Sequence, residues 1–442
     1  MRLTAQKIVQ LLRDKGFEAY WAGGCVRDML LGIHPKDFDI ATSAMPDQIQ
    51  KLIPKTIEVG KKFGVIIAIV NGHHFEIATF RSDSSYSDGR RPDAVIFTSA
   101  KEDALRRDFT INALFYDPID DKVIDYVDGQ KDIKEKIIRF IGDPHTRILE
   151  DYLRILRAVR FKNVLNFRYH PDTYNAIKQH AALIDKISRE RVRDELIKMM
   201  DSRNLRQVFE DLSETGLLKY IIPELEETKG VAQPIQYHQE GDVWEHTMRA
   251  ISSLRETASV NVKLATLLHD IGKPQTFKLK ERIRFDGHCQ ISAEIAQKIL
   301  SRLRFPKKDI DQITWLIKHH MMFIPLVKMS IGRRRHWFLQ ENFLDLMELF
   351  RADAMGSEPQ DLSLYNKVME LYRSDLSHLE EPPKPLLDGK EIMKILGISQ
   401  GPKIGEITAQ LLEYQLAKKI KTKKQALNWL NKFKKTSSPP EI

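Results

Sequence analysis

The stretch Lys36-Asp37-Phe38-Asp39-Ile40 is predicted to form a short strand that carries two carboxylates. Successive side chains of a strand point to opposite faces, so Asp37 and Asp39 project from the same face. Two carboxylates held side by side repel each other unless a cation lies between them, and Mg²⁺ prefers hard oxygen ligands of this kind. The stretch therefore predicts a Mg²⁺ site for phosphoryl transfer, where carboxylates and substrate phosphates share the metal.

A pair of glycines precedes this strand, in Gly23-Gly24-Cys25-Val26-Arg27-Asp28. The pair follows an expected strand that ends near Trp21, and it opens an expected helix that ends at Gly32. Without side chains, the glycines let backbone N–H groups approach a triphosphate at the helix N-terminus, and Arg27 adds a fixed positive charge. A tight turn without a ligand is the alternative.

Two further strands are expected at 65–70 and 75–80, joined as a hairpin through Asn71-Gly72. Alternation turns Glu76 to the opposite side from its apolar neighbours, so it either joins the two aspartates as a third carboxylate or faces water. Together these elements predict an α+β unit with a mixed sheet over residues 1–128.

Beyond residue 128 the apolar residues recur every three or four positions, which predicts helices. We expect a helical neck over 129–225, a second helical block over 235–356, and a helical basic tail over 384–435. The proline-rich stretch 380–385 is predicted to be a linker. The predicted class is thus an α+β head followed by all-helical domains.

Composition limits the kind of protein further. No apolar run approaches the roughly 18 residues of a membrane helix, and the N-terminus lacks the pattern of a signal peptide. With two cysteines far apart, neither a disulfide framework nor a cysteine-rich zinc site is expected, and we predict a cytoplasmic protein without an obligate protein partner.

The charge balance favours a polyanionic partner. Lys and Arg outnumber Asp and Glu by 70 to 61, which gives a formal charge of +9. Neutralising phosphates with such residues releases counterions, which favours binding to nucleic acid; a solvated helix face is the alternative. Many basic residues lie near the end of the chain: Lys418, Lys419, Lys421, Lys423, Lys424, Lys432, Lys434 and Lys435.

The order of the motifs in the first half resembles that of bacterial class II CCA-adding tRNA nucleotidyltransferases, which share a family with bacterial poly(A) polymerases. The resemblance spans residues 1 to about 220. It rests on the two stretches quoted above and on Leu30-Leu31-Gly32, Ala78-Thr79-Phe80-Arg81, Arg90-Arg91-Pro92-Asp93 and Arg106-Arg107-Asp108-Phe109-Thr110-Ile111-Asn112-Ala113.

This resemblance implies a polymerase-β-like head that adds CCA to the tRNA 3′ end from CTP and ATP, with two metals and release of pyrophosphate. Asp37 and Asp39 resemble the catalytic carboxylates. Gly24 and Arg27 resemble the triphosphate contacts. Arg107 resembles a nucleotide-binding arginine, and Asn112 resembles a ribose contact or, alternatively, caps a helix.

The stretch from Glu150 to Phe161 resembles the element of this family that selects the incoming base. Asp151 and Arg154 would lie side by side, one turn apart on one helix. A carboxylate accepts from an exocyclic amino group and a guanidinium donates to a ring nitrogen, a pairing that cytosine and adenine offer and uracil and guanine do not. An intrahelical ion pair is the alternative.

Two arginines follow on the expected base-selecting helix. Arg157 is expected to reach phosphate, and Arg160 is expected to support the fold or contact tRNA; the family treats both as nucleotide-binding. Relatives that add only A, only CC or a poly(A) tail remain alternatives. The segment 82–92 resembles the loop required for adding the terminal A, which argues against a CC-only enzyme.

The second helical block holds an ordered series of histidines and aspartates: His246, His269, Asp270, His288, His319, His320 and Asp353. Imidazoles and carboxylates suit a divalent transition metal, and ligands on successive helices can converge inside a bundle. The order resembles the HD-superfamily metal phosphohydrolases, which some CCA-adding enzymes carry as a fused domain.

The HD resemblance implies one metal held by His246, His269, Asp270 and Asp353. It implies a second metal held by His288 with either His319 or His320. A protein that is chiefly an HD phosphohydrolase of phosphate ends or cyclic phosphates is the alternative function. The tail resembles the C-terminal segment of HD-containing members and is expected either to contact tRNA or to serve only as a packing module.

Overall fold

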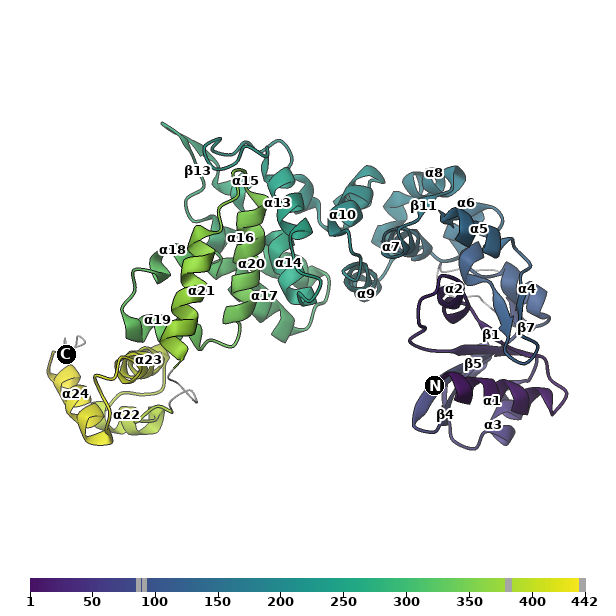
Figure 1. Cartoon of the computed structure of the whole chain (residues 1–442), viewed down its shortest axis with the longest axis horizontal. Coiled ribbons are helices and arrows are strands. Elements are labelled where there is room, and N and C mark those ends of the chain that lie inside the picture. Colours follow the sequence, from purple (N-terminus) through teal and green to yellow (C-terminus); the bar gives the residue numbers. More distant parts are fainter. Residues whose placement is uncertain (85–88, 90–93, 378–383, 437–442) are drawn as a thin grey trace. The chain divides into compact units, whose positions relative to one another are not determined.

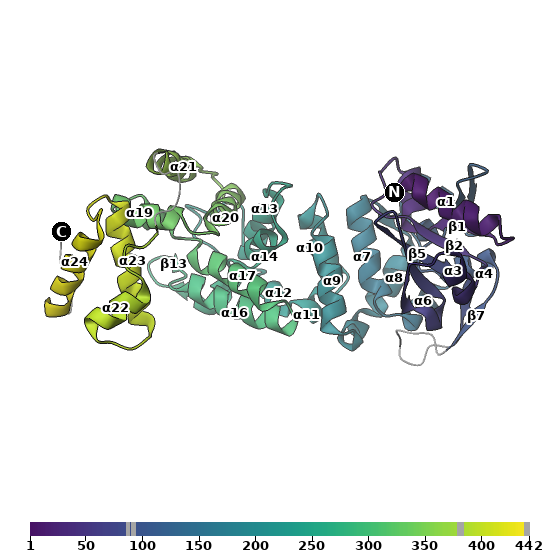
Figure 2. The same cartoon turned by 90° about the horizontal axis from the view of Figure 1, so that it is seen from below.

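The computed structural model describes residues 1–84, 89, 94–377 and 384–436. The chain divides into two units, residues 1–223 and 224–442 (Figures 1 and 2). The first contains the main sheet and the second is almost entirely helical, so the predicted α+β class is confirmed. The motif residues 90–93 and most of the predicted linker lie outside the described residues.

Seven strands of the described residues form the central sheet of the first unit, in the order β3-β4-β5-β2-β1-β8-β9. Strands β2 and β5 pair in parallel, and the other neighbours are antiparallel. The bounds are β1 (Ala19–Ala22), β2 (Asp39–Thr42), β3 (Thr56–Gly60), β4 (Val65–Val70), β5 (His73–Thr79), β8 (Phe115–Asp117) and β9 (Lys122–Ile124).

The predicted hairpin is confirmed as the pair β4 and β5. Val70 pairs with His73, so Asn71 and Gly72 form the two-residue turn. Both turn residues have positive φ, 52° and 76°, as the tight turns favoured in hairpins require. The turn fixes the register, and the register determines which β5 side chains share a face with β2.

Helix α1 (Arg2–Arg13) packs on β1 and β2 with a buried stripe of Ala5, Ile8, Val9 and Leu12. The stripe has the spacing of one helix face. Helices α2 (Gly24–Leu30), α3 (Pro46–Leu52) and α4 (Ala100–Leu105) complete the head. They fix the ends of the strands around which the candidate site is built.

The neck of the first unit consists of short helices around α7 (Arg154–Leu165). Helix α7 packs on α9 (Arg189–Met199) and α10 (Leu205–Glu214) through buried residues such as Ile155, Leu156 and Val159. The other helices are α5 (Gly129–Glu135), α6 (Pro144–Glu150), α8 (Pro171–Gln179) and α11 (Leu218–Ile221).

In the second unit, α13 lies against α20 and α17 lies between α14 and α16, side by side in both views (Figures 1 and 2). The bounds are α13 (Val243–Ser252), α14 (Val260–Leu268), α15 (Lys273–Thr276), α16 (His288–Arg302), α17 (Lys307–His319), α18 (Phe323–Leu326), α19 (Ile331–Phe338), α20 (Phe343–Gly356) and α21 (Ser363–Leu376). The hairpin of β12 (Lys278–Leu279) and β13 (Ile283–Arg284) precedes α16.

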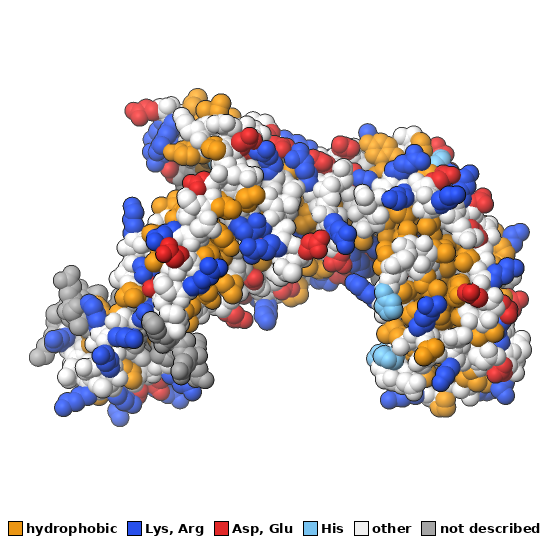
Figure 3. All heavy atoms as spheres, in the orientation of Figure 1, with side chains coloured by type: hydrophobic (Ala, Val, Ile, Leu, Met, Phe, Trp, Pro, Cys, Tyr) orange, Lys and Arg blue, Asp and Glu red, His pale blue; other side chains and the backbone are white. Residues whose placement is uncertain are grey.

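The tail forms a small core of its own from α22 (Gly389–Leu396), α23 (Pro402–Leu416) and α24 (Lys423–Thr436), with Leu411, Trp429 and Leu430 buried inside it. Figure 3 shows Lys and Arg side chains over these helices. The tail lysines from Lys418 to Lys434 are exposed. Within the described residues, no helix has both the length and the apolar character that crossing a lipid bilayer requires.

The tail packs on α19 through a close backbone contact at Gly332. A Cβ at this position would lie 2.1 Å from the carbonyl oxygen of Glu413 in α23. We therefore expect Gly332→Ala to push α23 away from α19 and to lower the free energy of unfolding by about 1–3 kcal/mol. Urea unfolding followed by tryptophan fluorescence measures the effect.

Gly405 provides the matched control because it lies in α23 itself, with open space where a Cβ would be placed. Gly405→Ala is expected to leave the unfolding midpoint unchanged or to raise it, since alanine favours a helix interior by about 0.5–1 kcal/mol. Equal midpoints for the two variants would show that α23 does not pack on Gly332.

Candidate active site and metal cluster

Three carboxylates lie together at one end of the sheet. Asp39 is the first residue of β2, and Asp37 lies two residues before it, outside the strand that was predicted to include it. The parallel register of Ile40 with Ile77 brings Glu76 beside Asp39. Glu76 therefore lies on the same side of the sheet as the aspartates and lines the same cleft, which is the first of its two predicted alternatives. Burial, with Glu76 and Asp37 nearby, raises the pKa of Asp39 to about 7. This all-oxygen group with mutual repulsion fits Mg²⁺.

The glycine turn lies next to these carboxylates. Gly23 has φ 74°, a left-handed conformation, and a Cβ there would lie 3.0 Å from Nη1 of Arg107. Arg27, one turn into α2, pairs with Asp28 at 2.6 Å and donates to Oδ1 of Asn112 at 2.7 Å. Gly23 therefore leaves room for Arg107, while Arg27 is held in place by Asp28 and Asn112.

Arg107 and Asn112 are held by neighbouring side chains. The buried carboxylate of Asp103 accepts from Arg107 at 3.0 Å. The amide of Asn112 accepts from Arg27 and donates to Asp108 at 3.2 Å. The capping alternative for Asn112 is wrong, because its side chain links two side chains and contacts no helix end.

The expectation that Asp151 and Arg154 share one helix is wrong. Helix α6 ends at Glu150 and α7 begins at Arg154, so Asp151 lies in the break between them. Its carboxylate accepts from the backbone N–H of Leu153 at 3.1 Å and from Arg191 at 3.0 Å. The break exists because these contacts fix Asp151 in an extended conformation.

Arg154 is also held without Asp151. Its guanidinium pairs with Glu150 and donates to the backbone carbonyls of Arg147 at 2.9 Å and Arg106 at 3.2 Å. The intrahelical ion pair between Asp151 and Arg154 is therefore absent, and both side chains line the same cleft.

The two arginines that follow on α7 are fixed by buried carboxylates. Arg157 pairs with Asp108 at 2.6 Å and Arg160 pairs with Glu195 at 2.6 Å. Burial would raise the pKa of Asp108, but Arg157 and Arg154 outweigh it and lower the pKa to about 2. The pair of Asp108 and Arg157 therefore remains charged at neutral pH.

One cleft of about 790 Å³ is lined by the three carboxylates, by Gly24, Asn112 and Asp151, and by arginines that the head and the neck contribute in equal number. The cleft also contains four basic residues to which the sequence analysis assigned no role, namely Arg81, Arg106, Arg191 and Lys198. Arg191 and Lys198 are seven residues apart on α9 and so lie on one helix face. This spacing is the feature of the sequence that could have indicated the two residues. The arrangement can bind a triphosphate and present its α-phosphate to the carboxylates.

In the second unit, four predicted residues from three helices converge on a buried point. Nε2 of His246 lies 2.9 Å from Asp353 and 3.7 Å from Asp270, and Nε2 of His269 lies 3.2 Å and 3.5 Å from Asp270 and Asp353. His269 Nε2 makes no hydrogen bond within the described residues. A buried imidazole nitrogen without a hydrogen bond, facing two carboxylates, fits a transition-metal ligand.

A second group adjoins the first through Asp270. Its Oδ1 lies 3.5 Å from Nε2 of His288 and 3.9 Å from Nε2 of His320, and the two imidazole nitrogens are 3.3 Å apart. Burial and His269 lower the pKa of His320 to about 4, so it is neutral, as a metal ligand must be. Asp270 therefore presents one oxygen to each group.

The alternative of His319 as a ligand is wrong. Its ring packs between Trp315 and Trp337, with centroids 4.7 and 5.2 Å away, and Nδ1 lies 2.8 Å from the carbonyl oxygen of Trp315. Adjacent helical side chains differ by about 100° in direction, so only one of the two histidines can face the cluster. That residue is His320, which caps α17.

Two residues outside the cluster orient its members. Glu240 holds Nδ1 of His246 at 2.9 Å, the carboxylate–histidine arrangement common at metal sites. Lys273 pairs with Asp270 at 2.6 Å, so it also contacts the cluster. The cluster opens into a cleft of about 950 Å³ that Lys273, Arg282 and Arg284 also line. The sequence analysis missed Glu240. Its position six residues before His246 is the feature that could have indicated it.

Three family models match the chain: the poly(A) polymerase head domain over residues 19–139, the "probable RNA and SrmB-binding site of polymerase A" over 166–229, and the HD domain over 243–357. The CCA-adding enzyme of Ligilactobacillus salivarius is 46% identical over 217 residues. That alignment covers 49% of this chain and 54% of the relative, so the chain spans about half the length of such relatives.

Two further relatives match over nearly the full length. The A-adding tRNA nucleotidyltransferase of Deinococcus radiodurans is 33% identical over 431 residues, covering 93% of this chain and 94% of the relative. The crystal structure of the Bacillus stearothermophilus CCA-adding enzyme in complex with CTP superposes with a TM-score of 0.74 at 28% identity, covering 98% of this chain and 97% of that one. The chain belongs to the family of bacterial CCA-adding enzymes and related tRNA nucleotidyltransferases that share the poly(A) polymerase head, and it carries a fused HD domain.

Proposed function

We propose that this chain adds CCA to the 3′ end of tRNA from CTP and ATP. One observation carries the proposal. The cleft of the first unit is lined by three carboxylates, by arginines that ion pairs hold in place, and by Asp151 and Arg154. The relatives named as CCA-adding enzymes support it.

In the proposed reaction, the 3′-hydroxyl oxygen of tRNA bonds to the α-phosphorus of CTP or ATP, and the bond to the bridging oxygen breaks to release pyrophosphate. Mg²⁺ held by Asp37 and Asp39, with Glu76 beside them, would supply charge stabilisation and lower the pKa of the hydroxyl. Arg27 and Arg107 would bind the triphosphate, while Gly24 lets the backbone approach it. Asn112 would contact the ribose.

Arg157 and Arg160 would line the nucleotide site while remaining paired with carboxylates. Because both are fixed before substrate binds, they cost little reorganisation when the triphosphate enters. The exposed lysines of the tail would contact tRNA phosphates, which position the RNA without reading its sequence. The solvent-facing direction of these lysines supports that role.

Asp151 and Arg154 would select the base from the two ends of the break between α6 and α7. Asp151→Asn replaces an acceptor-only group with one that also donates, so uracil and guanine gain a partner. We expect discrimination of CTP over UTP to fall by roughly ten- to hundred-fold, the value of about 1–3 kcal/mol for a good bidentate contact. Single-nucleotide incorporation with each of the four nucleotides measures this ratio.

Asp185→Asn is the matched control, because Asp185 is an exposed carboxylate that pairs with Arg189 outside the cleft. It is expected to discriminate like the parent protein. If Asp151→Asn also retains the parental preference, the base is selected elsewhere.

The number of nucleotides added is tested with three tRNAs, ending before CCA, after C and after CC, each with CTP and ATP separately and together. A CCA-adding enzyme extends all three to the full end. An enzyme that extends only the CC-ended tRNA adds A alone. This second candidate is favoured by one observation, the A-adding relative that matches this chain across both units.

We further propose that the HD cluster hydrolyses phosphate ends or cyclic phosphates with a divalent transition metal. His246, His269, Asp270 and Asp353 would hold one metal, and His288, His320 and Asp270 a second. The basic residues Lys273, Arg282 and Arg284 at the cleft would neutralise the substrate phosphate. Opening of a 2′,3′-cyclic nucleotide to the nucleoside monophosphate, lost on chelation and restored by added metal, tests this activity.

A further inference from the structure

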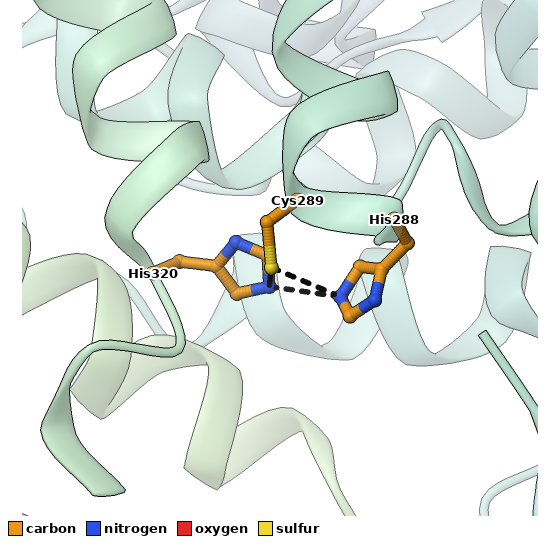
Figure 4. A group of neighbouring side chains, drawn as sticks. All are labelled: His288, Cys289 and His320. Carbon is orange, nitrogen blue, oxygen red and sulfur yellow. Dashed lines mark hydrogen bonds between the residues drawn. The ribbon is translucent and has the colours of Figure 1, made fainter. Parts of the chain in front are cut away.

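Cys289 lies beside the second group of the HD cluster. It follows His288 at the start of α16, and its Sγ is 3.6 Å from Nε2 of His288 and 4.0 Å from Nε2 of His320 (Figure 4). The same two nitrogens face Oδ1 of Asp270. One sulfur, two nitrogens and one oxygen therefore converge from three different parts of the second unit.

The spacing of these donors matches a tetrahedral metal site. With metal–nitrogen bonds of about 2.0–2.1 Å and metal–sulfur bonds of about 2.3 Å, tetrahedral geometry separates two nitrogens by about 3.3 Å and a nitrogen from a sulfur by about 3.6 Å. The two imidazole nitrogens are 3.3 Å apart, and Sγ lies 3.6 Å from the nearer one. The longer separations to His320 exceed these values by a few tenths of an ångström.

We propose that Cys289 ligates the second HD metal as a thiolate, which makes this a site for a thiolate-tolerant divalent cation such as Zn²⁺ or Co²⁺. The inference rests on the proposed metal function of the HD cluster. On binding, the S–H bond breaks and the proton leaves to water. A lone pair of the sulfur then bonds to the metal, with no change of oxidation state. A thiolate disfavours the hard cations Mg²⁺ and Mn²⁺, which prefer oxygen ligands.

The other cysteine provides a matched control. Cys25 is buried in the first unit, where its Sγ contacts the backbone carbonyl of Ala22 at 3.3 Å. It belongs to the head, and none of the HD histidines is in that unit. Cys25→Ser and Cys289→Ser each remove one sulfur, so they assign any sulfur-dependent signal to one position.

The test uses the full-length chain with Asp37→Asn and Asp39→Asn, so that the nucleotidyltransferase site does not add cobalt. The metal-free protein is titrated with Co²⁺, while equivalents are counted and the near-ultraviolet thiolate-to-cobalt charge-transfer band is recorded. We expect two equivalents and the band. Cys289→Ser should lose the band and bind one equivalent roughly ten-fold or more weakly, because even outer-shell partners of metals are worth about 10–100-fold in affinity. Cys25→Ser should retain both the two cobalt equivalents and the charge-transfer band.

The outcomes separate the two proposals. Two equivalents without the band, or a band that Cys289→Ser leaves in place, overturn the thiolate ligand and leave the two-metal HD cluster standing. A single equivalent without the band overturns the second site together with its thiolate. If no cobalt binds, the proposed metal function of the HD domain fails as well.

Discussion

Replacing Asp37 and Asp39 with asparagine is expected to slow nucleotide incorporation into tRNA by about 1,000-fold or more. Asparagine preserves the shape of each side chain but removes its charge, so the site can no longer hold Mg²⁺ against substrate phosphates. A single charge-stabilising group in phosphoryl transfer is worth about 10³–10⁵ in rate. Incorporation of labelled ATP into tRNA ending in CC measures the loss.

Asp47→Asn provides a control for this double variant. Asp47 is an exposed carboxylate on α3 that pairs with Lys61 at 3.0 Å, outside the cleft. It should incorporate nucleotides at the parental rate, and the double variant should still hydrolyse a 2′,3′-cyclic nucleotide to the nucleoside monophosphate. Incorporation within ten-fold of the parental rate in the double variant would overturn the assignment of the two aspartates.

Local patterns predicted part of the carboxylate group at the end of the sheet. The hairpin turn at Asn71-Gly72 determines the register of β5, and strand alternation then limits Glu76 to two directions. What the sequence lacked was the order of the strands. Glu76 reaches Asp39 only because β5 pairs in parallel with β2, a contact between segments more than 30 residues apart.

The stretch from Glu150 to Phe161 shows where periodicity fails. Leu149, Leu153 and Leu156 continue a helical spacing through the break, and neither glycine nor proline interrupts the chain between Glu150 and Arg154. The break comes from tertiary contacts, above all from Arg191, which lies 40 residues further on and binds Asp151. Propensity is a weak guide where such contacts decide the conformation.

The neighbours His319 and His320 show a similar limit. Both lie at the end of α17, and a helical pattern alone does not reveal which of them faces the bundle centre. The choice is made by packing, because His319 is enclosed by Trp315 and Trp337. Trp315, four residues before His319 and therefore on the same helix face, could have indicated this packing.

Asp270→Asn is expected to remove both metals from the HD cluster and to reduce its phosphohydrolase activity to background. Oδ2 of Asp270 faces His269 at 3.2 Å, while Oδ1 faces His288 at 3.5 Å, so one side chain serves both groups. Removing its charge is expected to weaken the binding of each metal by more than about 100-fold, since even the loss of an outer-shell partner lowers metal affinity by about 10–100-fold. Metal content after dialysis and hydrolysis of a 2′,3′-cyclic nucleotide to the nucleoside monophosphate measure the loss.

The same variant should incorporate nucleotides into tRNA at the parental rate, because the carboxylates of the head lie in the other unit. Asp311→Asn, which changes an exposed carboxylate of α17 paired with Lys307, should retain both metals and both activities. The Asp270 variant leaves Lys273 without its carboxylate, so its thermal midpoint must first be shown to exceed the assay temperature. A folded Asp270→Asn protein that kept two metals would mean that the two groups bind independently, with His246, His269 and Asp353 sufficient for the first.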